Sequence, residues 1–340
     1  MRVLNIHGVG DVRLDPRDPP KAGDRDVVVR VKACGICGSD LSYIKGGGIG
    51  RQDGGVTPIG HEAAGEVAQV GKDVTDVRLG QRVVINPMMT STFIGSGGPE
   101  GAFTEEVLVG EVQPGVTLLP IPDDLPFEVA ALAEPLAVAM HGVNRTGAKP
   151  GDKVAVFGCG PIGLGMVLWL VDRGITDVVA LDLAPERLAR AKALGARAVI
   201  NPATEDVRAR LMELHGSETN LLGMQAAGTD VYMDAAGAPS LVTDVLRMGK
   251  RHARLVITAV YSKPVEVDMS AMLINEMSVT SAIGYPNELN DVVAALPRVR
   301  DKAASMISHR YPFDEVIHAI GVAGTPQSAK VMIDFEGAAA

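Results

Sequence analysis

The stretch KVAVFGCGPIG, residues 153–163, decides the fold of this chain. A short apolar run is followed at once by Gly158, Gly160 and Gly163 in G-x-G-x-x-G spacing, and an apolar helical pattern comes next. One glycine permits a tight turn, one lets the backbone approach a pyrophosphate, and one lets helix and strand pack closely. Free N–H groups at the start of the helix bind the anion, so the stretch predicts a dinucleotide-binding loop.

Strand and helix patterns alternate from this loop onward. Strand patterns lie at residues 177–182, 198–200, 230–236, 254–260 and 277–283, and helical patterns at 161–174, 185–196 and 239–248. Such alternation is typical of a parallel sheet with helices on both faces. With the strand before the loop, the sequence predicts about six strands in a doubly wound α/β domain.

Asp182 ends the second of these strands, nineteen residues after Gly163. A carboxylate at this place accepts hydrogen bonds from an adenosine ribose and repels a 2′-phosphate. NAD is therefore favoured over NADP. Arg187 leaves NADP open, because an arginine there can stack on adenine or contact a phosphate.

The chain before about residue 144 has a different pattern. Short β-rich runs broken by glycine and proline lie at residues 26–33, 65–71, 81–87 and 102–109, which is typical of an all-β or mixed barrel. The glycine-rich residues 45–55 are expected to form a mobile loop. Beyond residue 285 we expect one more helix and a last strand at 329–335, which has no partner nearby in sequence and is expected to return to the first domain.

Bulk composition limits the possible partners. The 340 residues are 46% hydrophobic and 21% charged, as in soluble globular proteins of two domains. A net charge of -9 without a basic run argues against nucleic acid, so a small-molecule partner is expected. The longest apolar run, residues 166–171, is far shorter than the ~20 residues of a membrane span, and the chain starts without an apolar leader. We expect a cytoplasmic protein that does not bind membranes.

Candidate metal ligands lie in three motifs: CGICGSD (34–40), PIGHEAAGEV (58–67) and ALAEPLAVAMHGV (131–143). They supply Cys37, His61, Glu62 and Glu134. Catalytic zinc sites use three such ligands and keep one position open. Each residue also has a structural alternative: a buried cysteine, a core histidine or a glutamate at a helix entry. A redox dithiol is disfavoured, because a thioredoxin-like motif should open a helix next to a βαβ unit.

Together with GHEAAGEVAQVG (60–71), GCGPIGLG (158–165), ERLARAKALGA (186–196) and ISHRYPFDEVIHAI (307–320), these motifs resemble the zinc-dependent medium-chain alcohol dehydrogenase family. The likeness covers nearly the whole chain and is strongest to the sorbitol, butanediol and threonine dehydrogenase branch. It implies a GroES-like β-barrel catalytic domain over residues 1–145, completed by 283–340, and a Rossmann nucleotide-binding domain over 146–282. A homodimer or homotetramer is expected.

The resemblance also implies roles for the metal ligands. Cys37 matches the ligand cysteine and His61 the ligand imidazole, while Cys34 matches no ligand. Glu62 and Glu134 both match carboxylate ligands, and which of them binds zinc is expected to depend on state, with water filling the vacant place.

Further roles follow for neighbouring positions. Asp40 matches the residue that orients the ligand histidine, and Ser39 the hydroxyl that passes on the substrate proton. The expected substrate pocket contains Ser39, Tyr43, Ile59, Phe93 and Tyr285. The expected cofactor contacts are Gly158, Gly160, Pro161, Ile162, Gly163, Asp182, Arg187, Ala235, Thr258, Ala259, Val260, Ile283, Gly284 and Tyr285.

Three departures from the family pattern matter. Residues 86–103 are short and contain no cysteine, where many relatives hold a structural zinc with four cysteines, so one catalytic zinc and no structural zinc are expected. The histidine that often ends the proton relay is replaced by Ser42. An arginine and tyrosine pair common in the polyol branch is replaced by Gly284 and Tyr285, which argues against sorbitol itself as the substrate.

The sequence thus predicts a zinc-dependent oxidoreductase that transfers a hydride between NAD and a secondary alcohol, diol or small polyol, giving a ketone. Two alternatives remain at this stage. One is a zinc-free, NADPH-dependent reductase of the quinone-reductase type, and the other is a non-catalytic binding protein on the same fold. Cys37, His61, Glu134 and Asp182 count against the first, and the intact ligands with Ser39 count against the second.

Overall fold

The computed structural model describes residues 1–49, 55–220 and 222–335. The chain divides into two compact units, residues 1–134 with 289–340 (unit 1) and residues 135–288 (unit 2). Helix α3 (Ala133–Thr146) begins at this division, whereas the sequence suggested a boundary at the other end of the same helix. Each unit has a hydrophobic core of its own.

Unit 1 is built mainly of β-strands. Its largest sheet has seven strands in the order β17-β18-β3-β5-β6-β8, with β7 paired to β3. The four β-rich runs predicted from the sequence are β3, β5, β6 and β7. The strands are β3 (Val27–Gly35), β5 (Glu62–Val70), β6 (Arg82–Ile85), β7 (Glu106–Val109), β8 (Leu118–Pro120), β17 (Ile307–Pro312) and β18 (Lys330–Asp334).

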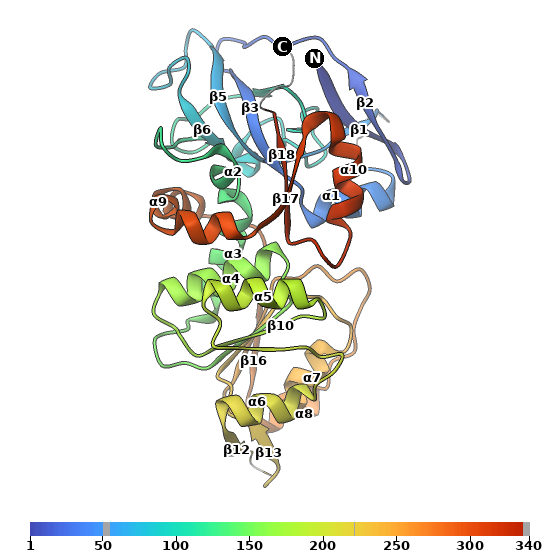
Figure 1. The fold of residues 1–340 in the computed structure, drawn as a ribbon, viewed down its shortest axis with the longest axis vertical. Helices are drawn as coiled ribbons and strands as arrows, with labels where there is room; N and C mark the ends of the chain where they lie inside the picture. The colour runs from blue at the N-terminus through green and yellow to red at the C-terminus, as the bar shows by residue number, and fades with distance from the viewer. Residues whose placement is uncertain (50–54, 221, 336–340) are drawn as a thin grey trace. The chain divides into compact units, whose positions relative to one another are not determined.

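The last strand, β18, returns to the first part of the chain as expected. It runs antiparallel to β3, with Met332 opposite Gly35 and Ile333 opposite Cys34, and Figure 1 shows this red strand beside the blue one. It also pairs in parallel with β17, a partner near in sequence that the pattern did not reveal. Helix α10 (Val316–Ala323), between the two strands, was missed as well, because its sequence VIHAIGVA is rich in β-branched residues and contains a glycine.

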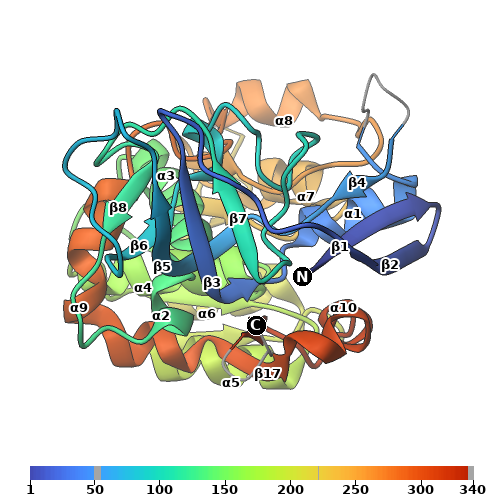
Figure 2. The same cartoon turned by 90° about the horizontal axis from the view of Figure 1, so that it is seen from above.

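A second, smaller sheet of unit 1 lies beside helix α1 (Gly38–Gly46), as Figure 2 shows. It contains β1 (Arg2–Gly8), β2 (Asp11–Pro16) and β4 (Thr57–Pro58) in the order β2-β1-β4. Residues 50–54 of the expected glycine-rich loop lie outside the described residues. The remaining elements of unit 1 are η1 (Pro87–Met89), α2 (Phe127–Ala130), α9 (Leu289–Ser305) and η2 (Phe313–Glu315).

The core of unit 1 lies against the sheet formed around β3. Val29, Val31, Val67, Val83 and Val107 come from four of its strands and are all buried. Burial of one such side chain contributes roughly 1.5–3 kcal/mol. Side-chain packing on this face therefore stabilises the sheet in addition to the hydrogen bonds between its strands.

Unit 2 contains the predicted parallel sheet, and all six expected strands are present. Their order is β11-β10-β9-β14-β15-β16, and every neighbouring pair is parallel. This is the strand order of a doubly wound dinucleotide-binding fold. The strands are β9 (Val154–Phe157), β10 (Val178–Leu181), β11 (Ala198–Ile200), β14 (Val231–Asp234), β15 (Arg254–Ile257) and β16 (Ser278–Ser281).

Helices cover both faces of this sheet, which is why every residue of β9, β10 and β14 is buried. Alternate residues such as Ala155 and Phe157 join one core cluster with Leu211 and Val245 of two helices. The opposite face is covered by α4, whose central residues are all buried. The helices of unit 2 after α3 are α4 (Pro161–Asp172), α5 (Pro185–Leu194), α6 (Val207–His215), α7 (Leu241–Met248) and α8 (Met269–Ile274).

Helices α6 and α8 and one hairpin of unit 2 were not predicted from the sequence. β12 (Ser217–Thr219) and β13 (Gln225–Ala227) form a separate antiparallel hairpin between α6 and β14. Its strands are only three residues long, too short for the alternation that reveals a strand in a sequence. Among the described residues, none of the helices has the length and apolar character that crossing a bilayer requires.

Candidate metal centre and nucleotide site

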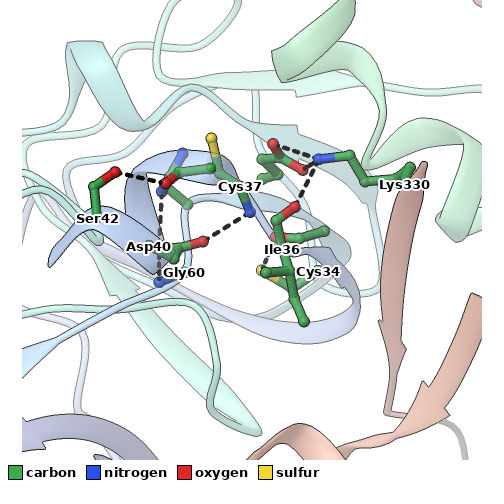
Figure 3. A network of polar contacts seen from close by, with 11 residues as sticks. Cys34, Ile36, Cys37, Asp40, Ser42, Gly60 and Lys330 are labelled. Carbon is green, nitrogen blue, oxygen red and sulfur yellow. Dashed lines mark hydrogen bonds and ion pairs between the residues drawn. The ribbon is translucent and has the colours of Figure 1, made fainter. Parts of the chain in front are cut away.

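The CGICGSD motif forms the turn from β3 into α1. Cys37 is the N-cap residue of the helix, and its N–H donates to Oδ2 of Asp40 at 2.9 Å. Oδ1 of the same carboxylate accepts the N–H of Gly60 at 3.3 Å. Figure 3 shows Asp40 between these two backbone groups. One buried side chain therefore holds the cysteine turn against the segment that carries His61.

Three potential metal ligands meet here, all from unit 1. The thiol of Cys37, a ring nitrogen of His61 and a carboxylate oxygen of Glu62 lie within 4.8 Å of one another. His61 and Glu62 are buried, and Cys37 is partly exposed, so the cluster opens on the side of the thiol. One thiolate, one imidazole and one carboxylate are a donor set that suits zinc.

The surroundings of His61 favour positive charge. Its Nδ1 is buried without a hydrogen bond and lies 3.5 Å from Oδ1 of Asp40. Burial disfavours the imidazolium ion, but the Asp40 carboxylate and the Cys37 thiolate outweigh burial, and the pKa of His61 lies well above its usual range. An environment that attracts a proton so strongly also fits a bound cation.

Glu62 has a partner that the sequence did not reveal. The ammonium group of Lys330 donates to both carboxylate oxygens, at 2.7 and 2.5 Å, and to the carbonyl of Ile36 at 2.9 Å. Burial alone would lower the pKa of Lys330, but the nearby Glu62 and Cys37 outweigh it and the pKa is raised. The Lys330 ammonium therefore places a positive charge beside the cluster. A lone lysine in the apolar run AKVMIDF was the only signal of it in the sequence.

Cys34 lies outside the cluster. It is fully buried, its sulfur is 3.8 Å from the carbonyl of Gly35, and burial raises the pKa of its thiol well above the usual range. It is a small core residue, and the C-x-x-C spacing brings no second sulfur into the three-residue cluster.

The other expected residues of unit 1 have varied surroundings. Glu134 is buried in the first turn of α3 and is not among the three clustered ligands. Ser42 is exposed, and its hydroxyl donates to the carbonyl of Gly38 within α1 at 3.0 Å. Ile59 is fully buried in the core, whereas 59% of Phe93 is exposed. Ser39 and Tyr43 lie on α1 and are partly exposed.

The glycine loop of unit 2 has the geometry that its spacing predicts. Gly158 has φ +88°, and a Cβ there would lie 2.9 Å from the backbone of Ala235. A Cβ on Gly163 would lie 1.7 Å from the carbonyl oxygen of Gly158, so only glycine allows this helix and strand to approach. A Cβ on Gly160 meets nothing within 4 Å. The loop therefore has open space at the N-terminus of α4, where a pyrophosphate would bind.

Asp182 is held in place beside this loop. Its carboxylate accepts the N–H of Cys159 at 2.7 Å and that of Ala184 at 2.8 Å. Arg187 approaches it to 3.9 Å. A carboxylate oxygen has two lone pairs, so both oxygens can still accept a hydrogen bond from a ribose hydroxyl.

The remaining expected cofactor residues follow the carboxyl ends of β14, β15 and β16, at the same edge of the sheet as the glycine loop. Among them the hydroxyl of Thr258 is buried without a hydrogen-bond partner. Tyr285 is buried, and Val260 and Ile283 are 88% and 86% exposed. The sequence missed one feature of this edge: Tyr261 donates its hydroxyl to Asp234 at 2.6 Å.

A parallel sheet with a glycine loop in one unit and a cysteine, histidine and glutamate cluster in the other define a metal-dependent dehydrogenase of the nicotinamide type. Comparison with known families agrees. A GroES-like alcohol dehydrogenase domain matches residues 23–123, and a zinc-binding dehydrogenase domain matches residues 161–298. The chain belongs to the zinc-dependent medium-chain alcohol dehydrogenase family.

Similar proteins cover almost the whole chain. A (R,R)-butanediol dehydrogenase of Bacillus subtilis is 33% identical over 93% of this chain and 94% of the relative. A sorbitol dehydrogenase of Rattus norvegicus is 29% identical over 97% of this chain and 94% of the relative. A solved zinc-binding dehydrogenase of Sinorhizobium meliloti, bound to NADP, has a TM-score of 0.84 with 27% identity and 98% coverage of both chains. The fold, family and enzyme class predicted from the sequence are confirmed.

Proposed function

We propose that this chain oxidises a secondary alcohol, diol or small polyol to the ketone, with NAD as hydride acceptor and one zinc ion per chain. The observation that carries the proposal is the cluster of Cys37, His61 and Glu62 in a chain that also has a dinucleotide loop. The relatives named butanediol and sorbitol dehydrogenase support the substrate class.

Cys37 and His61 would hold the zinc together with Glu62 or Glu134. When bound, zinc acts as a Lewis acid that lowers the pKa of an alcohol, so that the carbinol carbon can give up a hydride. Asp40 orients the His61 ring through its Nδ1 side. Its carboxylate lies 3.5 Å from Nδ1 and is itself held by two backbone N–H groups.

Ser39 is the residue that we propose takes the alcohol proton. It is partly exposed at the start of α1, two residues after Cys37. Ser42 is a poor second relay, because its hydroxyl already donates to Gly38 on the exposed side of the helix. The relay is therefore expected to pass from Ser39 to the cofactor ribose and solvent through water.

NAD is the preferred cofactor in this proposal. Asp182 carries a negative charge where the adenosine ribose is expected, and its two backbone hydrogen bonds hold it there. A 2′-phosphate would meet this charge, and like charges in contact cost several kcal/mol. The NADP bound to the Sinorhizobium relative makes a direct comparison of both cofactors necessary.

One catalytic zinc and no structural zinc are proposed because another interaction holds the lobe of residues 86–103. Glu100 is buried and forms an ion pair with Arg17 from the distant N-terminal segment, and the carbonyl of Glu100 accepts the N–H of Gly95 at 2.7 Å. This partly buried ion pair connects the lobe to the N-terminal segment without cysteines.

We also propose a cytoplasmic homodimer or homotetramer. All three cysteines are free, which suits a reducing compartment. β16 pairs only with β15 among the described strands, so the edge of the unit 2 sheet is available to a second copy. Sedimentation equilibrium of the purified protein tests the oligomeric state.

The test of the main proposal combines metal analysis with an NADH absorbance assay on a panel of secondary alcohols, diols and polyols. The expected result is about one zinc per chain and turnover of part of the panel with NAD. A protein without zinc that reduces quinones with NADPH would be the zinc-free reductase, and a zinc protein without turnover of any substrate would be a binding protein. Two zinc ions per chain would contradict the single-metal assignment.

A further inference from the structure

The ammonium group of Lys330 is buried beside the cluster of Cys37, His61 and Glu62 and has a single set of partners. Among the residues that the structure describes, Lys330 is the one lysine or arginine that is buried, with 1% of its surface exposed. An ammonium group has three N–H donors, and two go to the oxygens of Glu62 and one to the carbonyl of Ile36. Figure 3 shows Lys330 directed at this carbonyl, next to Cys37.

Glu62 is equally confined. Its carboxylate is fully buried, and a Cβ on Gly35 would lie 2.0 Å from its Oε2, so the carboxylate rests directly on the backbone of β3. The same carboxylate lies within 4.8 Å of the ligand atoms of Cys37 and His61. A metal ion and the ammonium group of Lys330 therefore compete for one buried carboxylate.

We propose that Lys330 is a positioning residue that holds Glu62 back from the metal, which keeps a coordination position open for water or the alcohol. If Glu62 moved fully onto the metal, Lys330 would be left as a buried cation without its counter-ion, and such a group is strongly destabilising. This inference rests on the proposed zinc site. It adds to the proposed function that Glu62 is kept from binding the metal fully, and that Lys330 of β18 keeps it there.

The variant Lys330→Met tests the inference because two outcomes change zinc affinity in opposite directions. Freeing Glu62 should raise the affinity, whereas disrupting the site should lower it. Methionine fills similar volume without charge, so Glu62 loses its partner and can bind zinc fully. Loss of a group that orients a metal ligand typically costs about 10- to 100-fold in metal affinity, and here we expect a change of that size in the opposite direction, toward tighter zinc binding in competition with a chelator. We also expect lower kcat and a changed visible spectrum of the Co²⁺-substituted protein, because the d–d bands depend on coordination number. A purely structural role would weaken zinc binding.

Three variants complete the experiment. Met332→Leu, on the same strand, controls for packing and should leave zinc affinity unchanged. Glu62→Gln alone leaves the Lys330 ammonium without its counter-ion, so its zinc affinity is compared with that of the double variant, in which both charges are removed. In the double variant Glu62→Gln with Lys330→Met the tightening should disappear.

Several results would overturn the inference. Weaker or unchanged zinc binding in Lys330→Met contradicts it, as does tightening that persists in the double variant, which would be a general charge effect. If Lys330→Met does not fold, the double variant Glu62→Gln with Lys330→Met takes its place, because it leaves no unpaired buried charge; a tenfold loss of zinc affinity relative to wild type would then contradict the inference, since Glu62 would be a full ligand in the unaltered protein. Wild-type protein that binds no zinc refutes the proposed function itself.

Discussion

The carboxylate of Glu62 occupies the space that a side chain at Gly35 would need: a Cβ on Gly35 would lie 2.0 Å from Oε2 and 3.2 Å from Cδ. Gly35 is the last residue of β3, two residues before Cys37. The glycine of the CGIC motif therefore has a steric role that does not involve backbone conformation. It makes room for the buried pair of Glu62 and Lys330.

Gly35→Ala should therefore be strongly destabilising. The added methyl group must displace the Glu62 carboxylate from its ion pair, and breaking a buried ion pair costs about 3–5 kcal/mol. Urea unfolding measures the loss in free energy of unfolding. Gly38→Ala is the matched control, because a Cβ there meets nothing within 4 Å. Equal stability of the two variants would show that the carboxylate moves without cost.

His215 makes the stability of unit 2 depend on pH. It is fully buried, its Nδ1 lies 2.7 Å from the hydroxyl of Thr229, and its Nε2 has no hydrogen-bond partner. Burial lowers its pKa from 6.5 to about 4, opposed by Asp177 and assisted by Arg197 and Lys153. The folded state therefore holds a neutral imidazole where the unfolded chain holds a proton between pH 4 and pH 6.5.

Proton linkage gives the direction in which the stability changes with pH. Because the unfolded state binds more protons in this range, the contribution of His215 is fully present above pH 6.5 and is lost as the pH falls to about 4. The loss is on the order of 2–3 kcal/mol. Urea unfolding between pH 7.5 and 4.5 should give a flatter pH dependence for His215→Gln than for wild type. His252→Asn, at a histidine whose side chain is 67% exposed, should follow wild type.

Local patterns in the sequence were sufficient for the features that depend on local physics. The glycine loop and the six parallel strands follow from spacing and periodicity. Lys330 could not be predicted in this way. It lies 268 residues from Glu62 in sequence, and the two meet only because β18 pairs with β3 in a register set by the whole sheet.

The ion pair of Arg17 and Glu100 is a second contact that local sequence patterns could not predict. The missing cysteines of residues 86–103 predicted the absence of a structural metal, but not what holds the lobe. The partners are 83 residues apart, and a charged pair has no periodic signature that connects its two members. The sequence therefore revealed the clustered residues Cys37, His61 and Glu62 more readily than the side chains that support them.

Asp182→Asn should shift cofactor preference. The amide keeps an acceptor oxygen for one of the two backbone N–H groups, but it removes the charge that opposes a 2′-phosphate. We expect the ratio of kcat/KM for NAD to that for NADP to fall roughly tenfold, or about 1.4 kcal/mol. Adding Leu183→Arg at an exposed neighbour should lower the ratio further. A wild-type enzyme that already prefers NADP would refute the role of Asp182.

The two cysteines of the CGIC motif give the sharpest comparison. Cys34 is fully buried outside the cluster, so Cys34→Ala removes little volume and no ligand, and it should cost about 1 kcal/mol of stability with activity retained. Cys37→Ala removes the thiolate of the proposed zinc site. Zinc affinity should fall sharply and turnover should drop by at least several hundred-fold, on the order of ~3–4 kcal/mol in the barrier. Binding of NAD should survive, because the glycine loop belongs to unit 2. Zinc content, turnover and NAD binding measured on both variants separate the two roles, and equal loss of zinc from both would mean that the cysteines bind the metal together.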